Sequence, residues 1–161
     1  MSFLYSQPYQ NSLSFDDEDN RTIAFIDSSL INCEVLAQRV IASARAIIIG
    51  SEDDGVREIS KILYRSSCKE IHVFSTGNPG CIYLGKSELS LSTLSKYSLE
   101  LSRWFDSYDA DSVESEPPYI SLYGCNLAAG DVGEELITKL SKITQAKISA
   151  SVNIFESSIL Y

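Results

Sequence analysis

Residues 22–50, TIAFIDSSLINCEVLAQRVIASARAIIIG, decide the fold class. The segment begins with an apolar run, TIAFID, and ends with another, RAIIIG. Between these runs, apolar side chains recur at the spacing of one helical face: Ile31, Val35, Leu36 and Val40. Strands that are apolar on both sides and joined by an amphipathic helix are typical of a parallel sheet with helices packed on it. The segment therefore predicts a strand, a helix and a second strand parallel to the first.

The rest of the chain repeats this alternation. Further apolar segments predict strands: KEIHVFS at 69–75, YISLYG at 119–124 and AKISAS at 146–151. Amphipathic stretches between them predict helices, whose inward faces are Val56, Ile59, Ile62 and Leu63; Leu94, Tyr97, Leu101 and Trp104; and Val132, Leu136, Ile137, Leu140 and Ile143. The expected helix caps are Asp53 or Asp54, then Ser92, then Asp131 with Glu134 in a capping box.

A turn-rich segment interrupts the alternation after the third strand. TGNPG predicts a sharp loop, and CIYLGKSELSL predicts a small β-hairpin near 81–90, with Gly85 and Lys86 at its turn. With right-handed crossovers, the elements build an α/β three-layer sandwich around a mostly parallel sheet of about five strands, plus this hairpin. We expect a single domain over 22–151, a flexible acidic tail over 1–21 and a C-terminal tail over 152–161.

Composition disfavours several kinds of partner and ligand. The 161 residues carry 13 basic and 22 acidic side chains, and the resulting net charge of -9 disfavours nucleic acid and anionic membrane surfaces. No apolar run approaches the ~20 residues that a membrane helix needs. The four cysteines lack the spacing of a zinc site, and no glycine-rich phosphate loop follows the first strand, so we expect no metal and no cofactor. The N-terminus lacks the pattern of a Sec signal peptide, so we expect a cytoplasmic protein with reduced thiols.

The candidate chemistry lies after two strands. Thr76–Cys81 follows the third strand and Gly124–Gly130 follows the fourth. Because the carboxyl ends of parallel strands meet at one edge of a sheet, these loops are expected to lie together. Cys125 follows a strand directly, beside a glycine, where a nucleophilic thiol can sit. The alternative is a small, half-buried residue at a tight corner.

Four stretches together carry a family resemblance: FIDSS at 25–29, IHVFSTGNPGCIYLG at 71–85, LSLSTLSKYSLELSRW at 89–104 and ISLYGCNLAAGDVGEELITKLSKIT at 120–144. They resemble the domain of unknown function four-three-four-seven. That family often heads long secreted or adhesin-like proteins of cyanobacteria and other bacteria, and it resembles the caspase- and gingipain-like cysteine peptidases. The resemblance implies a caspase-like fold. It also leaves export by a non-Sec route as an alternative to a cytoplasmic location.

In the peptidases, a histidine-glycine pair follows one strand and a cysteine follows the next. The resemblance carries the cysteine position onto Cys125, the glycine onto Gly77 and the histidine onto Thr76. A free thiol has a pKa of about 8.5 and needs a base, and threonine cannot act as one near neutral pH. The only histidine, His72, precedes Thr76 by four residues. At about 3.3 Å per residue it lies roughly 13 Å back along the strand, on the same face but too far away to replace the missing base.

We therefore expect a degenerate, non-catalytic domain that acts as a protein-binding or assembly module. Its expected partner is a protein, and a homo-oligomer is a further possibility. The candidate interaction surface comprises Asn78, Pro79, Cys81, Tyr83, Tyr123 and Asn126. Trp104 is expected in the core rather than on this surface.

Two alternatives remain open. The first is a residual cysteine hydrolase that uses Cys125 with a base supplied by a partner or by a carboxylate such as Asp27, Asp53 or Asp131. The second is a thiol redox role, in which Cys81 pairs with Cys125 across neighbouring loops.

Overall fold

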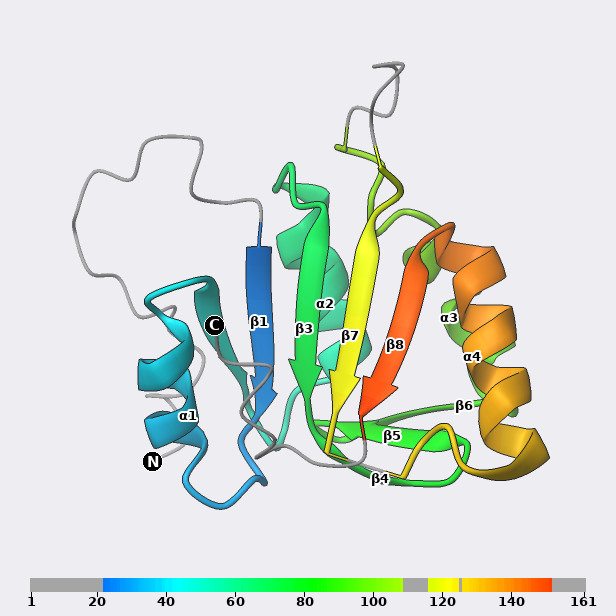
Figure 1. Cartoon of the computed structure of the whole chain (residues 1–161), viewed down its shortest axis with the longest axis horizontal. Helices are drawn as coiled ribbons and strands as arrows, with labels where there is room; N and C mark the ends of the chain where they lie inside the picture. The colour runs from blue at the N-terminus through cyan, green and yellow to red at the C-terminus, as the bar shows by residue number, and fades with distance from the viewer. Residues whose placement is uncertain (1–21, 109–115, 125, 152–161) are drawn as a thin grey trace.

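The main sheet determines where the candidate site lies. The computed structural model describes residues 22–108, 116–124 and 126–151. Five strands lie in the order β2-β1-β3-β7-β8, and each pairs in parallel with its neighbours (Figure 1). Their bounds are β1 Thr22–Asp27, β2 Arg45–Ile49, β3 Glu70–Phe74, β7 Tyr119–Tyr123 and β8 Lys147–Ser151. All the carboxyl ends of these strands therefore lie at one edge.

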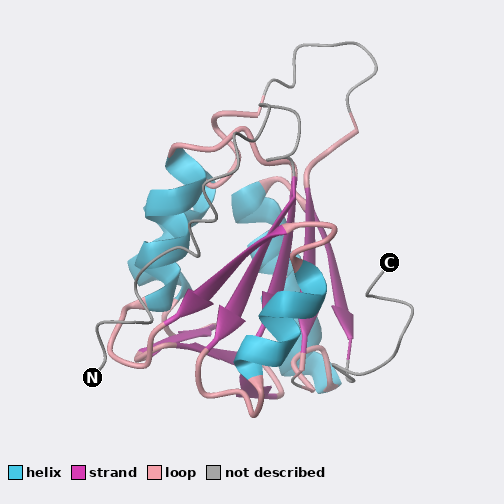
Figure 2. Cartoon of the chain, turned by 90° about the vertical axis from the view of Figure 1, so that its left-hand side faces the viewer, coloured by secondary structure: helices cyan, strands magenta, loops and turns pink. Residues whose placement is uncertain are grey.

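Helices cover both faces of the sheet (Figures 1 and 2). Among the described residues they are α1 Cys33–Val40, α2 Gly55–Tyr64, α3 Leu94–Ser102 and α4 Gly130–Thr144. The chain moves outward from β1 to β2 through α1, and then runs the opposite way across the sheet to β3, β7 and β8. Because crossovers between parallel strands are right-handed, this reversal puts α1 on one face and the other helices on the opposite face.

Each face of the sheet has its own apolar cluster. The larger cluster lies under α2, α3 and α4 and includes Ile23, Phe25, Ile59, Leu63, Ile71, Tyr97, Leu101, Ile120, Leu136 and Leu140. The smaller cluster lies under α1 and comprises Ala24, Ile26, Cys33, Ala37, Val40, Ala44, Phe74 and Tyr123. Strand β1 contributes alternate residues to the two clusters, which explains why it is apolar on both sides.

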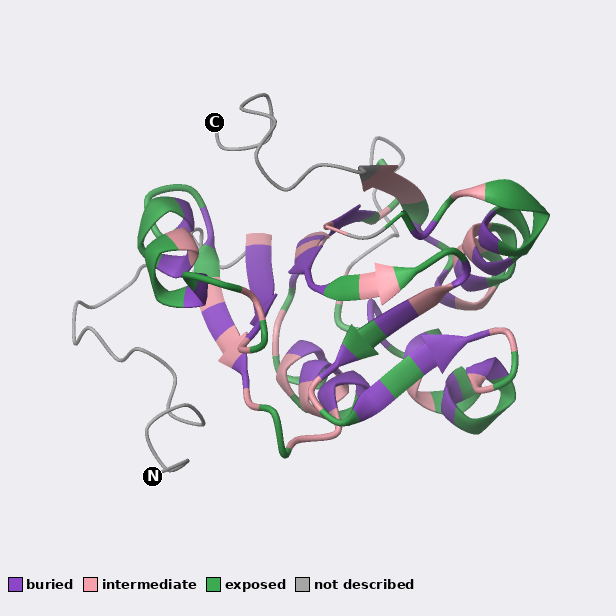
Figure 3. Cartoon of the chain, turned by 90° about the horizontal axis from the view of Figure 1, so that it is seen from below, coloured by how far each residue is buried: buried purple, intermediate pink, exposed green. Residues whose placement is uncertain are grey.

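A small antiparallel sheet lies beside the carboxyl edge of the main sheet. It consists of β4 Thr76–Asn78, β5 Cys81–Leu84 and β6 Ser87–Ser90, in that order. Gly80 and Gly85 have φ values of +74° and +60° at the two turns, a conformation that glycine adopts without steric cost. Figure 3 views the small sheet from below, where buried and exposed residues alternate along its strands.

The structure confirms the predicted fold class, the five-stranded parallel sheet and the hairpin. The hairpin has one more strand than expected, because residues 76–78, predicted as part of a loop, pair with β5 as β4. A pattern of three residues, TGN, is too short to predict a strand without its partner.

The predicted inward face of the first helix was correct at Val40, which is buried, and at Leu36, which is partly buried, but it was wrong at Ile31 and Val35. Ile31 is 88% exposed and Val35 is 48% exposed. The helix begins only at Cys33, after Asn32 with a left-handed φ of 60°, and it packs through Cys33, Ala37 and Val40. The small side chain of Ala37 allows the helix to approach the sheet closely, so the largest apolar residues are not the ones that face inward.

Of the predicted helix caps, only Asp54 is confirmed. Asp54 caps α2, and its Oδ1 accepts a hydrogen bond from the Arg57 N–H at 3.2 Å. Thr93, rather than Ser92, precedes α3, and its hydroxyl bonds back to β6 through the Glu88 carbonyl. Helix α4 begins at Gly130 without a side-chain cap, so the predicted capping box of Asp131 and Glu134 was wrong. Asp131 lies inside the first turn, where a negative charge suits the helix dipole.

The inward faces of the other helices were largely predicted correctly. Val56, Ile59 and Leu63 are buried in α2, as are Leu94, Tyr97, Leu101 and Trp104 in and after α3, and Leu136 and Leu140 in α4, whereas Ile62, Ile137 and Ile143 are partly buried. Val132 was placed wrongly, since it is 52% exposed.

The predicted tails, 1–21 and 152–161, lie outside the described residues. Within the described ranges, none of the helices combines the length and the apolar character needed to cross a membrane.

Candidate functional site

The loops after β3 and β7 are held together at the carboxyl edge of the sheet. The Ser75 N–H donates to the Tyr123 carbonyl at 3.1 Å, and the Gly80 N–H donates to the Leu127 carbonyl at 2.9 Å. A Cβ atom on Gly80 would lie 2.3 Å from Val132 Cγ1, so the β4–β5 turn packs directly against the start of α4. The topology therefore brings together the two loops that were predicted to meet at this edge.

Thr76 does not continue strand β3. That strand ends at Phe74, and Ser75 separates it from β4, where Thr76 pairs with Tyr83 and Gly77 pairs with Ile82. Thr76 is exposed and Gly77 is half-buried. The expectation that His72 and Thr76 share one strand and one face was wrong, because the chain leaves the main sheet between them. Cys125 lies outside the described residues.

His72 is held on the face of the sheet that α1 partly covers. Its Nδ1 lies 2.9 Å from the Tyr123 hydroxyl, and its Nε2 lies 3.3 Å from Glu70 Oε1. Both contacts are satisfied when Nε2–H donates to Glu70 and Nδ1 accepts the tyrosine proton. The rings of His72 and Tyr123 also stack, with centroids 5.7 Å apart. Both ring nitrogens are therefore engaged by neighbours on the sheet.

Burial lowers the pKa of His72 below its ordinary value of 6.5, and the nearby Glu70 carboxylate opposes this shift only in part. A folded-state pKa below the unfolded one means that the unfolded chain binds more protons in this range. The contribution of His72 to stability is present above pH 6.5 and is lost as the pH falls through the folded-state pKa.

We expect the free energy of unfolding to fall more steeply between pH 7.5 and pH 5 in the wild type than in His72→Gln, which cannot take up the proton. Urea unfolding at several pH values measures the two slopes. Carboxylates titrate in both proteins, so the difference between the curves isolates the imidazole. Parallel curves would contradict the burial of a neutral His72.

The carboxylates considered as alternative bases have structural contacts. Asp27 is 2% exposed, and its Oδ2 accepts a hydrogen bond from the Gly85 N–H at 2.6 Å, while its Oδ1 accepts one from the Ser29 N–H at 2.9 Å. Asp53 Oδ2 accepts one from the Gly50 N–H at 3.2 Å. Asp131 lies in the exposed first turn of α4.

Several predicted surface residues lie on one side of the small sheet. Strand pairing brings Thr76, Tyr83 and Glu88 into one row, and Asn78 and Cys81 into the next. We call these five residues the hairpin face. Asn78 Nδ2 donates to the Tyr83 hydroxyl at 3.3 Å, which fixes the ring beside the amide. The opposite side, with Ile82, Leu84 and Leu89, is buried in the core.

The remaining predicted surface residues differ in exposure. Pro79 and Asn126 are exposed, and Pro79 lies in the turn between β4 and β5. Tyr123 is only 6% exposed, so its prediction as a surface residue was wrong. It points to the α1 side of the main sheet and stacks on Phe74, with ring centroids 4.6 Å apart. Its stacking on Phe74 and its contact with His72 keep the Tyr123 ring within the smaller cluster.

The described cysteines are not activated thiols. Cys81 is a free thiol, and burial raises its pKa above the ordinary value. Cys68 is fully buried, and burial raises its pKa to about 11. Because the thiolate is the reactive form, both are poor nucleophiles at neutral pH.

Two residues at this edge have surroundings that the sequence did not predict. Asp27 was considered only as a base, although its main contact fixes the turn of the hairpin. Ser75 is 1% exposed, and its Oγ has no hydrogen-bond partner among the described residues. A polar residue at the end of an otherwise apolar strand was the available signal for both.

The fold and the site define a class of domain: a parallel α/β sandwich whose candidate centre lies where the loops after two middle strands meet a small antiparallel sheet. The chain belongs to the family described as domain of unknown function (DUF4347), whose model matches residues 23–157. This match confirms the family resemblance drawn from the four stretches of sequence.

The chain is also similar to a solved structure, that of caspase-1 from Spodoptera frugiperda. The two share 14% sequence identity, and the TM-score is 0.36 over 65% of this chain and 48% of that chain. The chain therefore spans about half the length of the insect protein. No curated protein matches the chain.

Proposed function

We propose that this chain is a degenerate, non-catalytic caspase- or gingipain-like domain that acts as a protein-binding module through its hairpin face. The observation that carries the proposal is the position of the only imidazole. His72 lies within the main sheet, bonded to Tyr123 and Glu70. Thr76, the residue onto which the family resemblance carries the peptidase histidine, lies on the small sheet.

The need for a proton acceptor supports the proposal that the domain is non-catalytic. A cysteine nucleophile needs a base within hydrogen-bond reach, and that base later protonates the leaving group. Thr76 offers only a hydroxyl. Asp27 and Asp53 accept hydrogen bonds from backbone N–H groups, which commits them to holding loops.

The composition of the hairpin face supports the proposal that the domain binds a protein. It presents an exposed tyrosine flanked by an amide, a hydroxyl, a thiol and a carboxylate, a mixture that suits a protein interface. Its position is fixed from beneath by the Asp27–Gly85 hydrogen bond and by an isolated β-bridge between Asp54 and Gly85. A preorganised surface of this kind loses little entropy when a partner binds.

The wild type is expected to cleave no peptide in a casein or peptide-library assay, and a thiol probe should label Cys125 no faster than free cysteine at pH 7. Thr76→His restores the residue type of the peptidase pattern and is expected to accelerate labelling, by roughly tenfold if the imidazole reaches the thiol. Thr76→Gln serves as the control of similar size. Cleavage by the wild type that is abolished in Cys125→Ala would overturn the proposal in favour of a residual hydrolase.

Tyr83→Glu is expected to reduce the capture of a protein partner from a lysate of the source organism by at least about tenfold. The reason is that tyrosines covered by a binding partner are frequent hot spots of interfaces. Tyr64→Glu is the matched control, since Tyr64 is 66% exposed on α2, outside the hairpin face. Quantitative mass spectrometry compares the three samples. Equal capture by both variants would place binding elsewhere on the molecule.

A further inference from the structure

Strand β2 forms one edge of the main sheet. Among the described strands it pairs only with β1, in continuous register along its whole length. Its sequence, RAIII, ends in consecutive isoleucines, which have a high β-propensity, and it contains no proline. Proteins usually protect the edge of a sheet with proline, a bulge or inward-pointing charges, because an apolar edge is a template for pairing with another strand. Strand β2 has this unprotected character.

The hydrogen bonds to β1 identify the backbone groups that point outward. The Ser28 N–H donates to the Ile49 carbonyl at 3.0 Å, so Ile49 faces β1. Alternate residues of a strand face the same neighbour, and the N–H and C=O groups of Ala46 and Ile48 therefore point away from the sheet. In the part of the chain that the structure describes, these outward groups have no hydrogen-bond partner.

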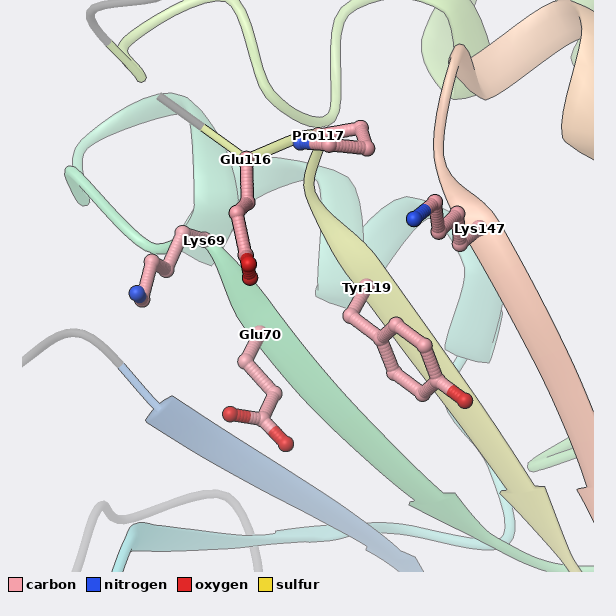
Figure 4. A pocket seen from close by; sticks show the side chains of 6 residues that line it. All are labelled: Lys69, Glu70, Glu116, Pro117, Tyr119 and Lys147. Carbon is pink, nitrogen blue, oxygen red and sulfur yellow. The ribbon is translucent and has the colours of Figure 1, made fainter. Parts of the chain in front are cut away.

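The opposite edge of the sheet has a different character. Strand β8, KISAS, carries two serines and a single isoleucine. Its first residue, Lys147, lines a cavity of about 310 Å³ at the amino end of the strands, together with a second lysine and two glutamates (Figure 4). The Lys147 N–H donates to the Pro118 carbonyl at 2.9 Å, so the outward groups of β8 belong to Ile148 and Ala150. Polar side chains and nearby charges make β8 the weaker template of the two.

Two copies of β2 fit each other in antiparallel register. When Ala46 of one copy lies opposite Ile48 of the other, every outward N–H and C=O group of these two residues gains a partner. The two Ile47 residues then meet at the two-fold axis. A register shifted toward the carboxyl end would pair Gly50, whose N–H is already bonded to Asp53 Oδ2 at 3.2 Å. The free backbone groups therefore favour one register.

Helix α1 is compatible with this pairing. It packs against both β1 and β2, so it lies about 5 Å from the two-fold axis when strands are about 4.8 Å apart. The two copies of α1 then run antiparallel about 10 Å apart, which is an ordinary distance for packed helices. Ile31 precedes α1 and Ile41 follows it, and they are 88% and 51% exposed. The antiparallel arrangement brings these opposite ends of the two helices next to each other.

The charges at the two ends of β2 are complementary. Arg45 begins the strand and is exposed, and residues 51–54, SEDD, form the turn after it. Two basic side chains lie near this turn: Arg57 pairs with Asp54, and Lys86 donates its backbone N–H to the turn. The turn stays net acidic with both counted. Antiparallel pairing places each Arg45, which has no ion pair within the described ranges, beside the turn of the other copy.

We propose that two copies of this chain associate through β2 in antiparallel register, with Ala46 opposite Ile48. The two main sheets then form one continuous sheet, and the two α1 helices lie side by side on one of its faces. A second copy fits this edge because the same strand supplies both the outward backbone groups and the opposite charges. The carboxyl edges of the two sheets, and with them the two hairpin faces, point in opposite directions.

Proline substitution in the full chain tests the edge. Ala46→Pro removes an outward N–H from β2 and keeps the hydrogen bonds to β1, and Ala150→Pro does the same at the β8 edge. In analytical ultracentrifugation we expect a dimeric wild type, an unchanged dimer in Ala150→Pro, and a dissociation constant raised at least about tenfold in Ala46→Pro. A monomeric wild type, an unaffected Ala46→Pro dimer, or equal dissociation of both variants would overturn the proposal. Circular dichroism checks that both variants are folded.

Amide hydrogen exchange of the wild type gives a second readout, which needs no variant. The amides of Ala46 and Ile48 are expected to exchange at least about tenfold more slowly above the dissociation constant than after dilution. The amides of Ile148 and Ala150, at the other edge, are expected to exchange at the same rate in both samples. Slow exchange of Ala46 and Ile48 that persists on dilution would mean that the same chain covers this edge, and the dimer would then be wrong.

Discussion

Trp104→Ala is expected to lower the free energy of unfolding by about 3–5 kcal/mol. Trp104 is 3% exposed in the larger core, directly after α3, and its side chain joins that helix to α2. The indole Nε1–H donates to Ser60 Oγ at 2.8 Å, and this hydroxyl donates in turn to the Val56 carbonyl at 2.7 Å. Alanine removes the largest side chain of this contact and leaves a cavity between the two helices.

Two companion variants separate packing from hydrogen bonding at this position. Trp104→Phe keeps most of the apolar contact and loses the Nε1–H donor, so a smaller loss of about 1–2 kcal/mol is expected. Tyr64→Ala, at an exposed position on the same helix as Ser60, is expected to change stability by less than about 0.5 kcal/mol. Urea denaturation followed by circular dichroism measures all three. A loss below about 1 kcal/mol in Trp104→Ala would show that the indole does not bridge α2 and α3.

Asp27→Ala is expected to cost about 3 kcal/mol, the second-largest effect. The carboxylate accepts from the Gly85 N–H at 2.6 Å and from the Ser29 N–H and hydroxyl. Hydrogen bonds to a charged acceptor contribute about 1.5–3 kcal/mol, and removing the acceptor leaves partly buried donors without a partner. The turn of the hairpin is expected to detach before the rest of the molecule unfolds.

Amide hydrogen exchange localises this effect. We expect Asp27→Ala to increase exchange in β5 and β6 by much more than in β3 and β7, because only the small sheet is attached through Gly85. Glu52→Ala changes an exposed acidic residue in the loop that contacts the same turn, and it is expected to leave exchange unaltered. Uniform acceleration across both sheets would contradict a local anchoring role.

The main sheet could be predicted because its strands are short apolar runs separated by amphipathic helices. TIAFID and RAIIIG are short, continuous apolar runs, which are typical of buried strands. The helix between them indicates that the two strands are parallel. The helix faces of α2 and α3 were also correct, since Ile59, Leu63 and Tyr97 follow the helical period closely. Local pattern and tertiary packing agree at these elements.

The failures lie where tertiary contacts override local pattern. Ile31 and Val35 match a helical face, but the left-handed Asn32 delays the start of α1 and changes its orientation. Thr93 stands before α3 in place of the predicted Ser92, and its hydroxyl donates to the Glu88 carbonyl of β6, a contact that no local rule predicts.

The candidate site was predicted as a pair of loops but not in its geometry. Parallel topology indicated that 76–81 and 124–130 would meet, and the Gly80–Leu127 hydrogen bond is one expression of this. The departure of the chain from the sheet at Ser75 could not be foreseen, because it depends on β4 pairing with β5. The surface role predicted for Tyr123 failed for a related reason, since an aromatic residue at a strand end can face either side.

Asp54 joins three elements through a single residue. Its Oδ1 caps α2, its Oδ2 accepts from the Tyr97 hydroxyl of α3 at 2.9 Å, and its backbone bridges to Gly85 at the hairpin turn. These contacts connect the small sheet to two helices, so we expect a load on the small sheet to reach both of them. This end of the protein should behave as a stiff platform, and a ligand pressing on it should tilt α2 and α3 together.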